Sequence, residues 1–101
     1  MELTSKQRAQ LRGIANTADT ILTVGKEGIS ENTIQQATTA LEARELIKCK
    51  VLETCPLTVR EAAESLAAST RSEVVQVIGT KCVLYRQSHT KDKALRIVLV
   101  K

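Results

Sequence analysis

The sequence predicts an α/β (α+β) domain with the element order α-β-α-β-α-β-β, in which a mixed sheet of about four strands packs against helices. Three observations support this prediction. Helix-start signals precede three amphipathic stretches, short apolar or alternating runs separate and follow them, and Gly79-Thr80 joins two such runs as a tight turn. Helices between strands imply crossover connections and some parallel pairing, whereas the runs on either side of Gly79-Thr80 should form an antiparallel hairpin.

Each predicted helix begins at a capping residue. Thr4 with Gln7, and Thr58 with Glu61, form capping boxes, in which a side chain at each end bonds to the backbone of the other. Ser30 is the expected N-cap of the second helix. We therefore expect helices that start after these residues, the first of them ending near residue 16.

The strands are expected where β-branched or alternating runs occur, over residues 20–24, 46–52, 73–78, 81–86 and, with a weaker pattern, 95–100. In the second run, Ile47, Cys49 and Val51 should face the core, with Lys48 and Lys50 on the opposite side. This cationic face is either a solvated sheet surface or partly covered by another element.

The composition favours an anionic partner and excludes one way of binding nucleic acid. The chain of 101 residues is long enough for one domain and carries a formal charge of +4. From Gly79 onward, six basic side chains stand against Asp92 alone, so this part carries +5 and the first 78 residues −1. Such a tail suits nucleic acid, although it also aids solubility. Tyr85 is the only aromatic residue, so the sequence argues against modules that stack bases on several rings.

The cysteines and the single histidine give no pattern of a catalytic or metal site. Cys49, Cys55 and Cys82 are an odd number without a C-x-x-C pair, and His89 lies in a polar stretch without ligand spacing. No signal-peptide core and no apolar run of about 18 to 20 residues is present. We expect a reduced, cytoplasmic protein, a monomer, with no membrane segment, no catalytic residues, no metal, no cofactor and no small-molecule substrate.

The tetrapeptide Gly25-Lys26-Glu27-Gly28 is the strongest candidate binding motif. It lies between the strand at 20–24 and the helix that Ser30 opens, so its backbone can approach a ligand while the helix N-terminus directs N–H groups toward it. A sugar-phosphate backbone would fit there. The alternative is an ordinary strand-to-helix turn, in which glycine is common.

Four blocks of the sequence resemble one known family. They are Thr4-Ser5-Lys6-Gln7-Arg8, Gly25-Lys26-Glu27-Gly28-Ile29, Glu45-Leu46-Ile47-Lys48-Cys49-Lys50-Val51, and Gln76-Val77-Ile78-Gly79 with Val83-Leu84-Tyr85-Arg86. Together they resemble the YhbY family, the stand-alone bacterial form of the CRM domain. On this resemblance, residues 1–87 are a CRM-type RNA-binding domain, and 88–101 are a basic C-terminal extension that could add a short strand.

The resemblance implies a topology similar to the C-terminal domain of translation initiation factor three, and a role with ribosomal RNA precursors in assembly of the large ribosomal subunit. It also implies that residues Gly25 to Gly28 contact RNA, as the G-x-x-G loop of KH domains does. The basic residues of the matching blocks become candidate phosphate contacts: Lys6, Arg8, Lys48, Lys50 and Arg86. Glu27 departs from this scheme, because its negative charge would weaken phosphate binding unless it turns away.

Two further basic residues, Arg12 and Lys81, complete the candidate set. Arg8 and Arg12 are one helical turn apart and form either a cationic ridge or a solvated flank. A second functional class also remains open. A protein-interaction module could dock on ribosomal proteins or another assembly factor without direct RNA recognition, with the run at 95–100 adding an edge strand to its partner.

Overall fold

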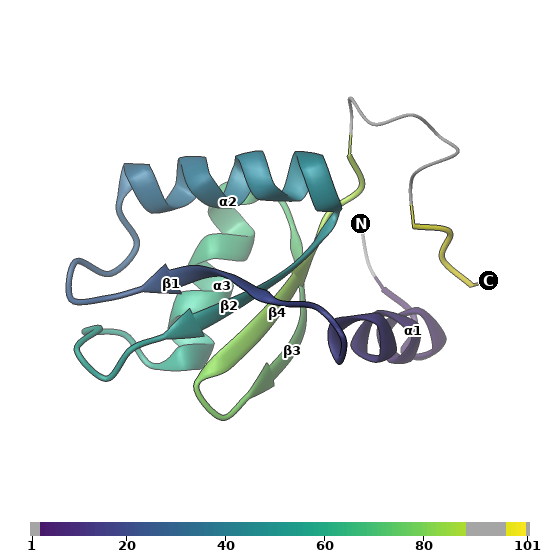
Figure 1. The fold of residues 1–101 in the computed structure, drawn as a ribbon, viewed down its shortest axis with the longest axis horizontal. Helices are drawn as coiled ribbons and strands as arrows, with labels where there is room; N and C mark the ends of the chain where they lie inside the picture. The colour runs from purple at the N-terminus through teal and green to yellow at the C-terminus, as the bar shows by residue number, and fades with distance from the viewer. Residues whose placement is uncertain (1–2, 89–96, 101) are drawn as a thin grey trace.

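The computed structural model describes residues 3–88 and 97–100, and in them it contains the predicted elements in the predicted order (Figure 1). The elements are α1 (Ser5–Ala15), β1 (Thr20–Val24), α2 (Glu31–Arg44), β2 (Leu46–Val51), α3 (Val59–Thr70), β3 (Glu73–Ile78) and β4 (Lys81–Tyr85). The α+β class is therefore confirmed.

The helices begin where the caps predict. Both capping boxes are formed, and in the second of them the Glu61 backbone N–H donates to Thr58 Oγ1 at 3.1 Å while Thr58 N–H donates to Glu61 Oε1 at 2.9 Å. Ser30 accepts from the backbone N–H of Thr33 at 3.2 Å. Because each cap supplies a partner to an N–H group that the helix itself leaves unpaired, it stabilises its helix start by about 1 kcal/mol.

The sheet is mixed, with the strand order β1-β2-β4-β3. β1 and β2 are parallel, and β4 pairs antiparallel with β2 on one side and β3 on the other. The hairpin after α3 therefore inserts its second strand between β2 and β3. The parallel crossover and the terminal hairpin are both as predicted.

The two faces of the sheet pack against different helices. A large core of Leu, Val, Ile, Ala and Cys side chains fills the space between the sheet and the pair α2 and α3. On the other face, Leu11 and Ala15 of α1 pack on Leu46, Val83 and Tyr85 in a second, smaller core. Since α1 covers only part of this face, the cationic side of β2 is partly covered by another element, one of the two alternatives left open by the sequence.

The C-terminal segment completes the second core and is not a strand. Ile97 and Leu99 pack against that core, while Gln10 of α1 binds the backbone on both sides of Leu99. Residues 97–100 have no regular secondary structure, so the strand expected over 95–100 is wrong for this part, and residues 95 and 96 lie outside the described residues. The reason is that side chains of α1, rather than a sheet edge, bind the backbone polar groups of this segment.

A buried carboxylate holds the same segment. Glu45, directly after α2, has a φ of +64° and a fully buried side chain. Its Oε2 accepts from Ser88 N–H at 2.7 Å, and its Oε1 accepts from Ile97 N–H at 2.6 Å. These two charge-assisted bonds stabilise an otherwise unfavourable buried charge and link the end of the chain to the corner between α2 and β2.

The interior of the sheet contains cysteine thiols. Cys49 and Cys82 are direct neighbours on β2 and β4, and both are fully buried free thiols. Cys55 is a third free thiol and is 9% exposed. The hydrogen bond with Cys82 and the burial of the thiol raise the pKa of Cys49. Tyr85 is 2% exposed and belongs to the second core, so this aromatic ring is not available to stack on a base. No described helix has the length and apolar character required to cross a membrane.

Candidate nucleic-acid interface

The glycine tetrapeptide forms a hydrogen-bonded turn whose two middle residues are exposed. The N–H of Gly28 donates to the carbonyl of Gly25 at 3.0 Å, and Lys26 and Glu27 lie exposed between them. Gly28 has a φ of +66°, which L side chains rarely adopt. A Cβ atom there would meet Pro56 only at an ordinary 3.6 Å. The glycine is therefore required by the backbone conformation, rather than by lack of space.

The turn and the first turn of α2 enclose a hollow of about 310 Å³. Its lining consists of glycine backbone, uncharged polar side chains and one side chain of each charge: Thr23, Gly25, Lys26, Glu27, Gly28, Ser30, Asn32, Thr33 and Gln36. The N-terminus of α2 contributes a partial positive charge at this place. Glu27 is part of the lining and exposed, and Glu31 adds a second exposed acid in the first turn of the helix, so two negative charges lie close to the hollow.

Lysines on the open part of the sheet lie beside this turn. Thr23, two residues before Gly25, is the β1 neighbour of Lys50 on β2, and Lys50 lies directly opposite Lys81 on β4. Both lysines are exposed, and Lys48 is half-buried on the same side, next to the area that α1 covers. Like charges directly opposite each other destabilise an antiparallel pair. The row Thr23-Lys50-Lys81 therefore does not stabilise the sheet, whereas its positive charge suits the binding of a polyanion.

The cations of α1 lie elsewhere in the molecule. Figure 1 shows α1 at the end of the long axis opposite to the connection between β1 and α2, and the molecule is 38 Å long. Lys6 and Arg12 are exposed there. Arg8 Nη1 donates to the carbonyl of Val74 and, at 3.4 Å, to that of Val75, so this arginine helps to hold α1 on β3. Its contact with phosphate stays a prediction, because these bonds use only one of its two terminal nitrogen atoms.

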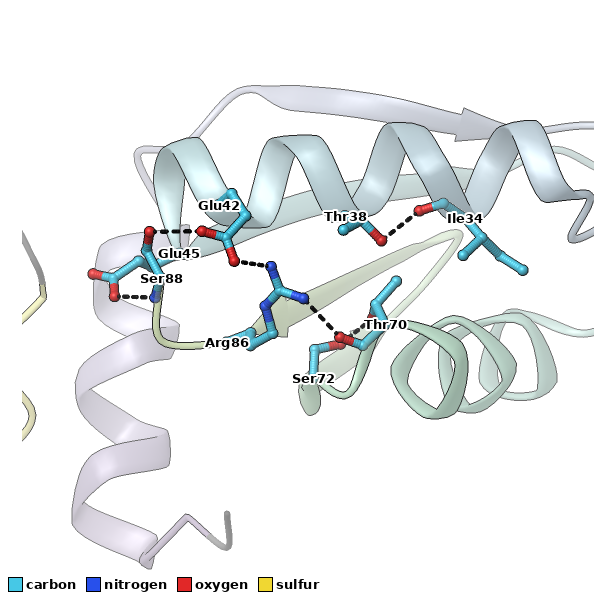
Figure 2. A network of polar contacts seen from close by, with 8 residues as sticks. All are labelled: Ile34, Thr38, Glu42, Glu45, Thr70, Ser72, Arg86 and Ser88. Carbon is cyan, nitrogen blue, oxygen red and sulfur yellow. Dashed lines mark hydrogen bonds and ion pairs between the residues drawn. The ribbon is translucent and has the colours of Figure 1, made fainter. Parts of the chain in front are cut away.

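Arg86, another candidate phosphate contact, has partners within the protein. Figure 2 shows its guanidinium between α2 and the end of α3. Nη2 forms an ion pair with Glu42 Oε1 at 2.5 Å, and Nη1 donates to the carbonyl of Thr70 at 3.1 Å. Its side chain is only 14% exposed, and Ser88 Oγ donates to the other oxygen of Glu42 at 3.0 Å. The charge of Arg86 is thus compensated within the protein.

The structure thus brings together Gly25, Lys26, Glu27, Gly28, Lys50 and Lys81, with Lys48 at their margin, and separates Lys6 and Arg12 from them. Sequence reasoning missed the uncharged members of the hollow, Thr23, Asn32, Thr33 and Gln36. The signal for Asn32, Thr33 and Gln36 was present as polar, uncharged residues that follow Glu31 in the first turns of the second helix. Among the described residues, no group of three or more His, Cys, Asp or Glu side chains could hold a metal, and His89 lies outside them.

Comparisons with known proteins agree with this architecture. Residues 3–86 match the CRS1 / YhbY (CRM) domain family. The chain is 46% identical over 86 residues to "Probable RNA-binding protein YqeI" of Bacillus subtilis, covering 85% of this chain and 90% of that one. It is 33% identical to an "RNA-binding protein" of Haemophilus influenzae, over 85% and 87% of the two chains. The solution structure of SAV1595 from Staphylococcus aureus is 47% identical, with a TM-score of 0.76 over 93% of this chain and 97% of that chain.

Proposed function

Because this chain belongs to the CRS1 / YhbY (CRM) domain family, we propose that it is an RNA-binding protein that acts on ribosomal RNA precursors and assists assembly of the large ribosomal subunit. Relatives named as RNA-binding proteins support the binding activity. The family resemblance supports the assembly role, and the proposal includes a cytoplasmic location and no chemistry of the protein's own.

The single observation that supports this proposal most strongly is the position of the Lys50 and Lys81 pair beside the glycine turn. A strand of RNA whose phosphates meet the turn would continue onto the lysine row. Lysine ammonium groups and the start of α2 supply the positive charge, and no aromatic platform is needed for contacts with the backbone. Such binding depends on counterion release and therefore weakens as salt is added.

A protein-docking module was the alternative, and it relied on a free edge strand near the C-terminus. Residues 97–100 instead pack on α1 and the second core. The described part of the segment is therefore occupied within the molecule. RNA binding remains the better-supported function.

Binding to short, protein-free RNA at several salt concentrations tests the proposal. Each phosphate contact contributes about 0.7 to the slope of log affinity against log salt on a single strand. Replacing Lys26 with Asp should lower the affinity about tenfold, which corresponds to about 1.4 kcal/mol, and reduce the slope. Arg71→Asp is the matched control, because Arg71 is an exposed cation at the end of α3, which is linked through Arg86 to the last turn of α2 and not to the glycine turn.

The assignment to this surface fails if the two variants bind equally well. The proposal of RNA binding as such fails if the unmodified protein shows no salt-dependent affinity. Sedimentation of a cell extract tests the finer claim, because co-migration with large-subunit precursors is expected. A position among free proteins at low salt would exclude the assembly role.

A further inference from the structure

A second hollow continues the first along α2. It has a volume of about 570 Å³ and lies between Ile21 of β1 and the outward side of the helix, lined by Asn32, Gln35, Gln36, Thr39, Ala40, Ala43 and Arg44. Asn32 and Gln36 also line the hollow at the glycine turn. The two hollows are therefore parts of one groove, which we call the α2 groove, and Figure 1 shows α2 running alongside β1 from the turn.

The helix side that forms this groove has an unusual chemistry. Its lining residues recur at intervals of three and four, so they make one continuous stripe on α2. From Asn32 to Thr39 the stripe consists of amides and a hydroxyl, all exposed and uncharged. The acids of the helix, Glu31 and Glu42, are not among its lining residues, and Glu42 is paired with Arg86 (Figure 2).

The other wall adds apolar and main-chain surface. β1 is an edge strand, with β2 on one side and no further strand among the described residues on the other. An edge strand exposes backbone N–H and C=O groups. Ile21 is half-buried, and the small side chains of Ala40 and Ala43 leave the space beside it open. The volume lies within the roughly 300 to 1,000 Å³ of small-ligand sites.

From these observations we infer that the α2 groove is a binding site for the unpaired bases of a single-stranded RNA whose phosphates contact the glycine turn. This inference rests on the proposed function. Asn and Gln side chains present a donor and an acceptor together, which suits base edges, whereas phosphates prefer the cations found at the turn and on the lysine row. Bases can reach such a groove only when they are not paired in a duplex. The site therefore supplies base discrimination that the lysine row cannot provide.

Nuclear magnetic resonance distinguishes the two sites, because side-chain NH₂ groups of Asn and Gln give their own signals. The ¹⁵N-labelled protein is titrated with single-stranded RNA of about ten nucleotides, and separately with a ribose-phosphate oligomer of equal length without bases. RNA should shift the NH₂ signals of Gln35, which lines only the second hollow, together with the turn amides. The abasic oligomer should shift the turn amides alone.

Variants give the second measurement. Gln35→Ala removes an amide of the groove outside the turn, and Ala43→Leu fills the groove from an exposed helix position. Each should lower the affinity for the preferred homopolymer RNA about tenfold, while the salt slope stays unchanged. Ala68→Leu makes the same change at an exposed position of α3 and should have no effect.

The outcomes separate the two proposals. The proposed function stands if RNA binds with a salt-dependent affinity and shifts the turn amides. The groove proposal is overturned if, in the same experiment, the groove signals do not move and Gln35→Ala and Ala43→Leu bind normally. If RNA does not bind at all, both are overturned.

Discussion

Removing the charge of Lys81 should make the protein more stable and its RNA binding weaker. Lys81 and Lys50 lie directly opposite each other on β4 and β2, and both are exposed. For two unit charges about 6 Å apart in water, Coulomb's law gives a repulsion of about 0.7 kcal/mol. Salt at 0.1 M, with a screening length of about 10 Å, reduces this to about 0.4 kcal/mol. This agrees with the 0.2 to 1 kcal/mol typical of charged cross-strand pairs.

A double-mutant cycle isolates this repulsion from the strand preference of the new residue. Lys50→Thr, Lys81→Thr and the double variant are unfolded in urea, and the coupling free energy between the two positions is extracted. We expect a repulsive coupling of about 0.4 kcal/mol that decreases at 1 M salt. The same single variants should lose RNA affinity, each with a salt slope lower by about 0.7. A coupling of zero, or a favourable one, would refute the idea that the lysine row is maintained at a cost in stability.

Three further outcomes follow from contacts in the structure. Arg86→Ala should lower the free energy of unfolding by about 2 to 3 kcal/mol in a urea titration. This loss is smaller than for a fully buried ion pair because Glu42 is 25% exposed. The RNA affinity of the folded variant should not change. The hydrogen bond with the Thr58 backbone lowers the pKa of Glu61, so its ionised form contributes stability at neutral pH that is lost on acidification. The stability difference between the wild type and Glu61→Gln should therefore shrink between about pH 7 and pH 3, and a constant difference would contradict this. Cys49 and Cys82 should react with a thiol reagent at least about a hundredfold more slowly in the native protein than in denaturant, as measured by mass spectrometry of the labelled peptides.

Local signals allowed much of the fold to be predicted. The two capping boxes and Ser30 located the helix starts because capping involves residues only three positions apart. The alternation in β2 separated Cys49 from Lys48 and Lys50 because side chains alternate across a sheet. The strand order could not be predicted, since it depends on which edges meet after the chain has folded back.

The candidate site was predicted less well, because charge alone does not reveal a partner. Arg8 and Arg86 looked like the other basic residues in the sequence. Their partners, Val74 and Glu42, are 66 and 44 positions away along the chain. The stripe that starts at Asn32 was missed because it carries no charge that would mark it as a binding surface. Polar residues on a helix surface are commonly only solvated.

The attachment of residues 97–100 to α1 has a consequence for the order in which the molecule folds. The smaller core brings α1 together with Ile97 and Leu99, and the bond between Gln10 and Val100 beside them spans 90 positions of the chain. The carboxylate of Glu45 likewise depends on Ser88 and Ile97, which are 43 and 52 positions away. Because contacts between residues far apart in the sequence form slowly, the core under α2 and α3 can assemble before the opposite side of the sheet is sealed.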